Sequence, residues 1–255
     1  ARHPVVTTWQ VEPPRSIVDE TLITGRGTFD PPRQLALDNA FPILTGYRDS
    51  VGIGYRFNFA DPLGFARLGV TAAWTPDRDL PGNERSHAEV NWRYLGWRAD
   101  LAWNRTDFFD LFGRTRRSRY GFAANVCYGD LLIYDEPRKL TLSTDLAWYD
   151  RIDTLPWAQN VPTLSDRLAV AEVALRYSDA RRSRGAVDDE SGILASGAAA
   201  VRNADGATVG QVVGTFDHGW ALPLRHSSIW LRTVAGASSG EASDPVANFY
   251  FGGFG

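Results

Sequence analysis

The most specific catalytic pattern in this chain is a serine motif near its C-terminal end. Residues 236–240 read Gly-Ala-Ser-Ser-Gly, which matches the G-x-S-x-G pattern with Ser238 as the nucleophile. Such a serine becomes exposed and reactive where a strand turns sharply into a helix. Here a loop of Gly, Ser and Ala follows a strand pattern, and no helix signal comes after it. We therefore expect a loop at Ser238 and assign no catalytic residue.

Histidine is the second source of possible chemistry, and the chain has four. His87 lies on the same side of an alternating segment as Glu89, so it could act as a base or a metal ligand. His218 and His226 are separated by a turn and could approach one another, but no third ligand is apparent. The spacings H-x-H and H-E-x-x-H do not occur. We expect a hydrogen bond at His87, no metal site, no cofactor and no enzymatic activity.

The elements that would position these residues are β-strands, because polar and apolar residues alternate one by one. In residues 87–94, Ala88, Val90, Trp92 and Tyr94 share one side, and charged or polar residues occupy the other. A period of two predicts strands with two unlike faces. The pattern predicts about eleven strands, most near the 9–11 residues that cross a bilayer at a tilt. They cover residues 51–59, 67–74, 87–94, 97–104, 119–128, 139–148, 169–178, 191–201, 208–220, 227–236 and 248–254.

Length and composition limit the fold to one all-β domain. The chain has 255 residues and a net charge of −3, which gives no indication of nucleic-acid binding. A single cysteine, Cys127, excludes an internal disulfide. Residues 1–47 contain several prolines and are expected to form a linker or lead-in segment, with one short strand at most, at residues 34–37. Residues 48–255 are expected to form the domain itself.

The two faces of the predicted strands differ sharply. On the apolar face, tryptophans lie near the strand ends, as in the aromatic girdles of membrane barrels; these are Trp74, Trp92, Trp97, Trp103 and Trp148. On the polar face, charges of both signs would line the lumen of such a barrel; these are Arg56, Arg67, Glu89, Arg93, Arg98, Asp100, Arg119, Asp145, Glu172 and Arg176. They could line an ion-selective channel, but the mixture of signs favours a network of ion pairs that fills the lumen.

Together these patterns predict an antiparallel transmembrane β-barrel. Short turns alternate with long loops at residues 104–117 and 150–167, as in such barrels, although the connections at 179–190 and 203–206 break the rule. A cluster of arginines at 114, 116, 117 and 119 could bind lipopolysaccharide phosphates, or could be a solvated rim. The competing fold is a soluble β-sandwich, which would bury its apolar face.

Two stretches carry a resemblance to a known family. The first contains Asn91-Trp92-Arg93-Tyr94 and the run from Asn104 to Thr115, which reads NRTDFFDLFGRT. The second contains the run from Leu224 to Arg232 and the ending Phe249-Tyr250-Phe251-Gly252-Gly253-Phe254-Gly255. Over roughly residues 45–255 the chain resembles the C-terminal barrel of bacterial proteins that carry a TolB-like β-propeller ahead of a surface-antigen-type barrel. In the wider superfamily of BamA- and TamA-type barrels, a glycine-aromatic motif like Phe251, Gly252, Gly253 and Phe254 lies late in the domain.

The resemblance implies an outer-membrane location and a complete barrel of about sixteen strands. The chain is therefore expected to be part of a larger barrel, and the natural polypeptide to continue past Gly255. The expected role is outer-membrane biogenesis, protein insertion or translocation, or anchoring of a periplasmic module. Outer-membrane lipid, lipopolysaccharide and other protein subunits are the expected partners. Two alternatives stay open: a passive porin-like channel, and a barrel enzyme acting on lipid through Ser238 or His87.

Overall fold

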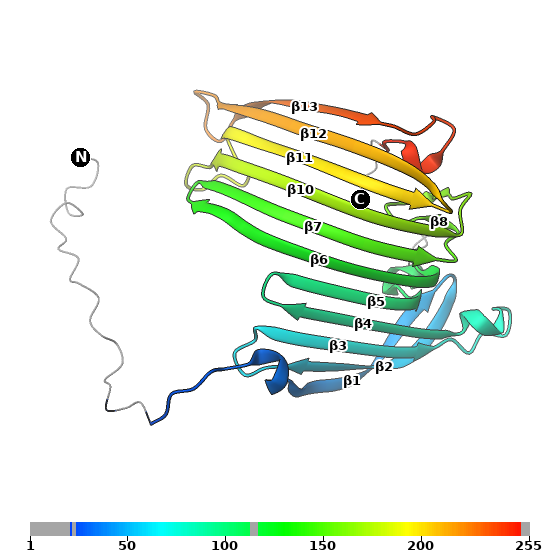
Figure 1. Cartoon of the computed structure of the whole chain (residues 1–255). Coiled ribbons are helices and arrows are strands. Elements are labelled where there is room, and N and C mark those ends of the chain that lie inside the picture. The colour runs from blue at the N-terminus through cyan, green and yellow to red at the C-terminus, as the bar shows by residue number, and fades with distance from the viewer. Residues whose placement is uncertain (1–20, 22–23, 113–116, 251–255) are drawn as a thin grey trace. The chain divides into compact units, whose positions relative to one another are not determined.

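The chain folds as an all-β protein around one large antiparallel sheet (Figure 1). The computed structural model describes residues 21, 24–112 and 117–250. Eleven strands form the sheet in the order β1-β2-β3-β4-β5-β6-β7-β10-β11-β12-β13, and a separate two-stranded sheet joins β8 and β9. Each strand of the large sheet therefore pairs with its neighbours along the chain, except that the β8–β9 hairpin lies within the connection from β7 to β10.

The strands of the large sheet are long. Their bounds are β1 Ala36–Tyr47, β2 Ser50–Ala60, β3 Ala66–Trp74, β4 Ser86–Tyr94, β5 Trp97–Arg105, β6 Arg119–Asp135, β7 Arg138–Asp150, β10 Arg167–Arg181, β11 Ser191–Ala204, β12 Ala207–Ala221 and β13 Ser228–Ser238. The small hairpin is β8 Thr154–Leu155 and β9 Ala158–Pro162. Short 3₁₀ helices lie in the connections: η2 Pro31–Gln34, η3 Gly82–Glu84, η4 Phe108–Leu111 and η5 Pro245–Ala247.

The all-β prediction is confirmed, but one strand near the N-terminus was not predicted and one predicted near the C-terminus is not observed. Residues 36–47, expected to belong to the lead-in, form the whole of β1, which pairs with β2 along its length. Pro42 interrupts the alternation pattern, but β1 is an edge strand, where a proline is tolerated because one side needs no ladder bond. The expected strand at 248–254 is wrong for residues 248–250, which are not in a strand, and its remaining residues lie outside the described part.

The sheet curls around its polar face. Register places Tyr47 of β1 and His87 of β4 on that face, and their rings lie 4.7 Å apart although two strands separate them in the sheet. At the same end, the backbone N–H and C=O of Gly46 bond to those of Asp107, which follows β5, at 3.2 and 2.9 Å. Contacts that skip several strands require strong curvature. The polar face is therefore concave and the apolar face convex.

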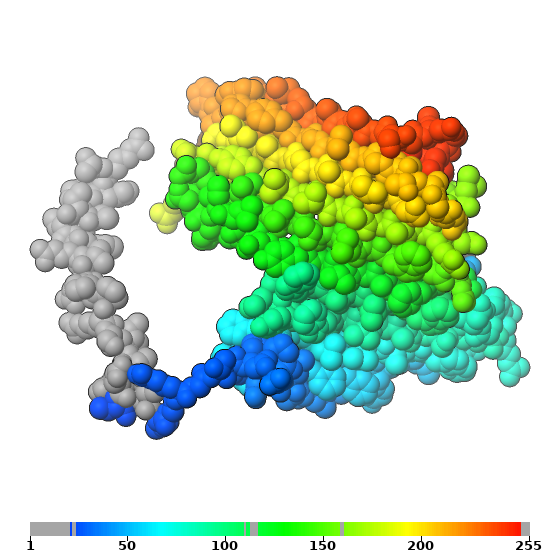
Figure 2. All heavy atoms as spheres, viewed as in Figure 1, coloured from blue at the N-terminus to red at the C-terminus, as the bar shows by residue number. Residues whose placement is uncertain are grey.

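The described sheet is open, because β1 and β13 are its edges and do not pair with each other. In Figure 2 the residue colours pass in sequence order from β1 to β13 across the surface, and a recess lies where the β4–β5 hairpin ends short of β6. Trp97, the first residue of β5, pairs with Tyr128 of β6, and β6 continues past this pair to Asp135. This extra length of β6 explains the recess. A small apolar cluster at the opposite ends of the strands joins the β7–β10 connection to η5 through Ile152, Leu155, Leu168 and Val246.

Candidate functional site

The convex face of the sheet is apolar and exposed. Many of the large side chains on it have more than a third of their surface exposed, while many of the buried apolar residues are alanines. A soluble sheet protein shows the opposite arrangement, with large apolar side chains in the core. The exposed members of this face include Leu44, Val51, Ile53, Tyr55, Phe57, Trp74, Trp97, Leu101, Val126, Leu146, Trp148, Val173, Leu175, Val201, Val212, Phe216, Trp220, Ile229 and Leu231.

The five tryptophans expected in an aromatic girdle all lie on this convex face, at strand ends. Trp74 is the last residue of β3 and Trp97 the first of β5. Trp92, Trp103 and Trp148 each lie two residues before the end of their strand. Tyrosine and tryptophan side chains with one apolar part and one polar group suit a boundary between hydrocarbon and water. Whether they meet a bilayer boundary stays a prediction.

The ten charged residues expected in a lumen share the concave face. Six of them line one polar cavity of about 930 Å³ near the β2–β3 and β4–β5 turns: Arg56, Arg67, Glu89, Arg93, Arg98 and Asp100. Arg119 lines a second cavity, where its guanidinium donates to the carbonyl of Pro156 in the β8–β9 hairpin. Asp145 of β7 is opposite Glu172 of β10, and Arg176 lies further along β10.

The expected network of ion pairs does not form among these ten residues. In the described part of the chain no two of them lie within ion-pair distance, and Glu89 instead meets Arg105 at 3.9 Å. The carboxylates accept hydrogen bonds from amides: Asn91 donates to Asp100 at 2.8 Å, and Asn125 donates to Asp145 at 2.9 Å. The cause is the strand register, which places like charges opposite each other rather than opposite charges.

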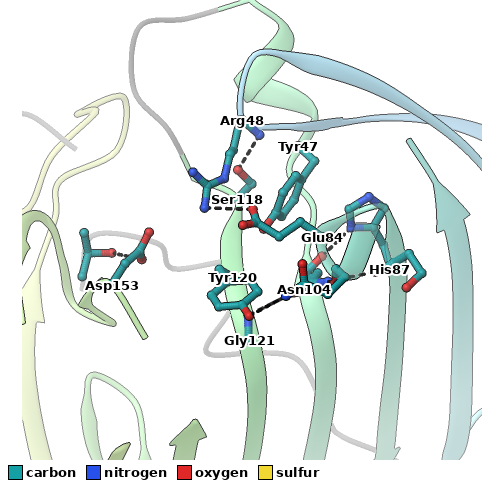
Figure 3. A network of polar contacts seen from close by, with 12 residues as sticks. Tyr47, Arg48, Glu84, His87, Asn104, Ser118, Tyr120, Gly121 and Asp153 are labelled. Atoms are coloured by element: carbon teal, nitrogen blue, oxygen red, sulfur yellow. Dashed lines mark hydrogen bonds and ion pairs between the residues drawn. The ribbon is translucent and has the colours of Figure 1, made fainter. Parts of the chain in front are cut away.

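A buried polar cluster, which the sequence patterns did not indicate, lies where the sheet curls most strongly (Figure 3). Tyr47, at the end of β1, is fully buried, and its hydroxyl donates to Glu84 of η3 at 3.0 Å. Arg48 pairs with the same carboxylate at 2.9 Å, and its backbone N–H donates to the hydroxyl of Ser118 at 2.8 Å. The β1–β2 turn is thereby joined to the β3–β4 and β5–β6 connections.

Asn104 is the centre of a second set of bonds in this cluster. Its side chain is fully buried, and its amide donates to the carbonyls of Asn83 at 2.7 Å and Ser86 at 3.1 Å. Its side-chain oxygen accepts from the backbone N–H of Gly121 at 3.0 Å. The residue adopts φ of +46°, which asparagine tolerates better than most residues do. One side chain thus joins the ends of β4, β5 and β6.

His87 is held by the same cluster, and the expected hydrogen bond is confirmed. Its Nε2 lies 2.8 Å from the hydroxyl of Thr75, and its Nδ1 lies 2.8 Å from the carbonyl oxygen of Asn104. The ring is 5% exposed and packs on Tyr47. Both ring nitrogens are therefore engaged in contacts that join the ends of β3, β4 and β5.

The serine motif has no nucleophile elbow. Ser238 is the last residue of β13, and the next helical segment is the short η5 at Pro245–Ala247. The hydroxyl of Ser239 accepts a hydrogen bond from the backbone N–H of Gly210 at 2.8 Å. This bond joins the segment that follows β13 to β12. The expectation of a loop holds for residues 239 and 240, whereas residues 236–238 belong to the strand.

His218 and His226 lie in different parts of the fold and contact different residues. The rings of His218 and Trp220 meet edge-on on the convex face, with centroids 4.3 Å apart. His226 lies 3.2 Å from Glu190, which is in the β10–β11 connection. Hydrogen bonds from the side chain and the backbone of Ser183, and then from His226, hold the pKa of Glu190 below its ordinary value. In the described residues no three His, Cys, Asp or Glu side chains gather closely enough to hold a metal ion.

Two sequence features can be followed only in part. Arg114 and Arg116 of the arginine cluster lie outside the described residues, as do Phe251, Gly252, Gly253 and Phe254 of the superfamily-like motif. Arg117 lies over the ring of Phe109, at 5.0 Å from its centroid. Arg119 faces the concave side, so its guanidinium does not extend the exposed rim.

The β2–β3 turn carries a carboxylate whose state should respond to pH. Burial acts to raise the pKa of Asp61, but hydrogen bonds from the backbone N–H groups of Ala66 and Leu63 outweigh it, and the pKa lies below its ordinary value. A carboxylate with a lowered folded pKa stabilises the fold above its unfolded pKa of about 3.9, and this stability is lost as pH falls through the folded pKa. We expect Asp61→Asn to be less stable than wild type at neutral pH and to approach it on acidification.

Thermal unfolding in detergent micelles from neutral pH down to about pH 3 measures this difference, since that range spans the unfolded pKa. A gap between the two proteins that stays constant with pH would contradict the assignment to Asp61.

No described helix is both long enough and apolar enough to span a membrane. In comparisons with known proteins, the chain matches no family model, no curated protein and no solved structure.

Proposed function

We propose that the chain is the membrane-embedded part of an outer-membrane β-barrel, with its convex apolar face toward lipid and its concave polar face toward the lumen. The main observation that supports this proposal is the exposed apolar face, which extends from β1 to β13. In water such a face would drive association, because monomeric soluble proteins rarely expose apolar patches larger than a few hundred Å². In lipid the same face needs no partner.

Strand direction supports a larger barrel than the described sheet. In an antiparallel sheet of eleven strands, the first and last strands run in the same direction. A membrane barrel has to close, because unpaired backbone groups in hydrocarbon cost several kcal/mol each. Closure with antiparallel pairing throughout therefore needs an odd number of strands in addition to the eleven strands of the large sheet. The proposal assigns those strands to sequence or chains other than the described sheet.

The proposed role is outer-membrane biogenesis, protein insertion or translocation, or anchoring of a periplasmic module. This role rests on the resemblance of residues 45–255 to surface-antigen-type barrels and on the absence of a reactive arrangement at Ser238 and His87 in the described structure. The partners proposed are outer-membrane lipid, lipopolysaccharide and other protein subunits.

Membrane fractionation with gel electrophoresis tests the location and the closure together. The chain is expressed in a Gram-negative host behind a secretion signal, and the outer-membrane fraction is run boiled and unboiled. A change in mobility on boiling is expected for a closed, detergent-resistant barrel. Protein in the membrane fraction without that change would indicate a barrel completed by another chain. Protein that stays in the soluble fraction and purifies without detergent would contradict the proposal.

A porin-like channel is the second candidate, and one observation favours it. No two of the ten charged residues expected in the lumen form an ion pair in the described part of the chain, and those lining the cavity of about 930 Å³ are available to dissolved ions. Planar-bilayer recordings separate the two roles. Ohmic single-channel steps would support the channel, and silent bilayers containing folded protein would count against it.

A further inference from the structure

Three arginines of the concave face lie side by side across neighbouring strands. Register places Arg67 of β3 opposite Arg93 of β4, and Arg93 opposite Arg98 of β5. Adjacent strands are about 4.8 Å apart, so the three side chains start from backbone positions spaced at about that distance. Like charges directly opposite each other in a sheet destabilise it. This row, called the arginine row below, therefore has a cost unless something neutralises it.

No carboxylate of the described chain forms an ion pair with the arginine row. All three side chains are exposed, and none forms an ion pair or a hydrogen bond with another described residue. The acids in the same cavity are Asp38, Asp61, Glu89 and Asp100. Each carries a negative charge near the row, and its hydrogen-bond partners show whether it binds the arginines directly.

Each of these acids is engaged elsewhere. Asn39 donates to Asp38 at 2.8 Å, and the β2–β3 turn occupies the carboxylate of Asp61 with backbone N–H groups. Asn91 donates to Glu89 at 3.0 Å and to Asp100 at 2.8 Å, and Glu89 also meets Arg105. The cavity therefore holds a row of free guanidinium groups beside carboxylates that already have donors.

The same transverse line changes sign further along the sheet. Arg98 is opposite Cys127, Cys127 is opposite Asp145, and Asp145 is opposite Glu172. Along this line, positive charge lies on β3–β5 and negative charge on β7 and β10, while Glu89 and Asp100 lie beside the line on β4 and β5. An anion on the concave face is attracted to the first group and repelled from the second, which localises it in the cavity of about 930 Å³.

We propose that the arginine row is a binding site for a phosphate group. Guanidinium groups bind phosphate through pairs of parallel N–H···O bonds, and neighbouring arginines can share one tetrahedral anion between them. Arg93 is at the centre of the row, so its guanidinium could bind a phosphate together with either Arg67 or Arg98. The phosphate belongs either to a free anion or to a lipid headgroup. The proposal concerns the concave face alone and does not depend on the role proposed for the whole barrel.

The test compares Arg93→Gln with wild type, both as the full chain folded in detergent. Inorganic phosphate is titrated at constant ionic strength against chloride, and binding is measured by calorimetry and by the rise in unfolding temperature. Loss of one charged, bidentate partner is expected to weaken binding about 10- to 100-fold. Without phosphate, Arg93→Gln should unfold at the same or a slightly higher temperature, because it relieves like-charge repulsion.

Arg176→Gln is the matched control. Arg176 is also an exposed arginine of the concave face, but it lies on β10 outside the cavity. It should bind phosphate as wild type does. Arg98→Gln is the second test variant and should behave like Arg93→Gln, so that a folding defect in one of them leaves the test intact.

A parallel arm identifies the source of the phosphate. Short-chain phosphatidic acid is compared with short-chain phosphatidylcholine in the same detergent. Binding of inorganic phosphate that is lost in Arg93→Gln supports a free anion, and binding confined to phosphatidic acid and lost in the same variant supports a lipid headgroup. No binding in either arm, or equal binding by wild type, Arg93→Gln and Arg176→Gln, would overturn the proposal.

Discussion

Replacing Leu101 with arginine is expected to destabilise the folded protein in a bilayer by about 2–4 kcal/mol, which is the cost of a cation at the midplane of a membrane barrel. Leu101 is the middle residue of β5 and is 45% exposed on the convex face. It lies between Trp97 and Trp103, and its cross-strand neighbours are Val90 and Ala124. No acidic side chain stands beside it, so the new charge would face hydrocarbon.

The control introduces the same side chain on the other face. Ser143 of β7 is exposed on the concave face, and its neighbours Gly129 and Ala174 leave space. We expect Ser143→Arg to change stability by less than about 0.5 kcal/mol. Urea titration of both variants in lipid vesicles measures the difference. Similar stability of the two arginine variants would refute the assignment of the convex face to lipid.

Alternation was enough to predict the strands whose two faces differ. The segment 139–148 was predicted from alternation alone, and β7 spans Arg138–Asp150. In β1 the pattern fails, because Phe41 and Ile43 place apolar side chains on the concave face while Leu44 is on the convex face. Apolar residues on both faces, together with Pro42, remove the period of two. Pairing with β2, rather than local sequence, forms this strand.

Register explains why the faces of the charged residues were predicted and their partners were not. Alternation assigns Arg67, Arg93 and Arg98 to one face, but their alignment depends on the lengths of the turns between strands. The two-residue β4–β5 turn, Leu95-Gly96, aligns Arg93 with Arg98. A shift of two residues would keep every face and change every pair. The expected ion-pair network needed opposite charges in one row, and the observed alignment excludes it.

The buried cluster at the curled end was beyond prediction for a different reason. Tyr47 and Glu84 are 37 residues apart and meet only because the sheet curls. Curvature comes from the summed twist of many strands, which no local motif encodes. The available signal was weak: Asn104 lies where a predicted strand ends, and asparagine is a residue that adopts positive φ.

Replacing Asn104 with alanine is expected to cost about 3–5 kcal/mol of folding free energy, because it removes the partner of one buried backbone N–H and of two part-buried carbonyls. The carbonyls of Asn83 and Ser86 would lose their donor, and the N–H of Gly121 would lose its acceptor. Water cannot replace the lost bonds readily, since Asn104 is fully buried. Alanine would also be strained at φ of +46°.

Two further variants separate the hydrogen bonds from the backbone strain. Asn104→Gly relieves the strain but not the missing bonds, so it should still lose about 2–4 kcal/mol. Asn203 at the β11–β12 turn makes its bonds at the surface, and Asn203→Ala should cost about 1 kcal/mol or less. Urea unfolding in detergent micelles measures all three. If Asn104→Gly proved as stable as wild type, the bonds of Asn104 would not hold the curled end together, and its other contacts, such as Tyr47 with Glu84 and Gly46 with Asp107, would have to do so.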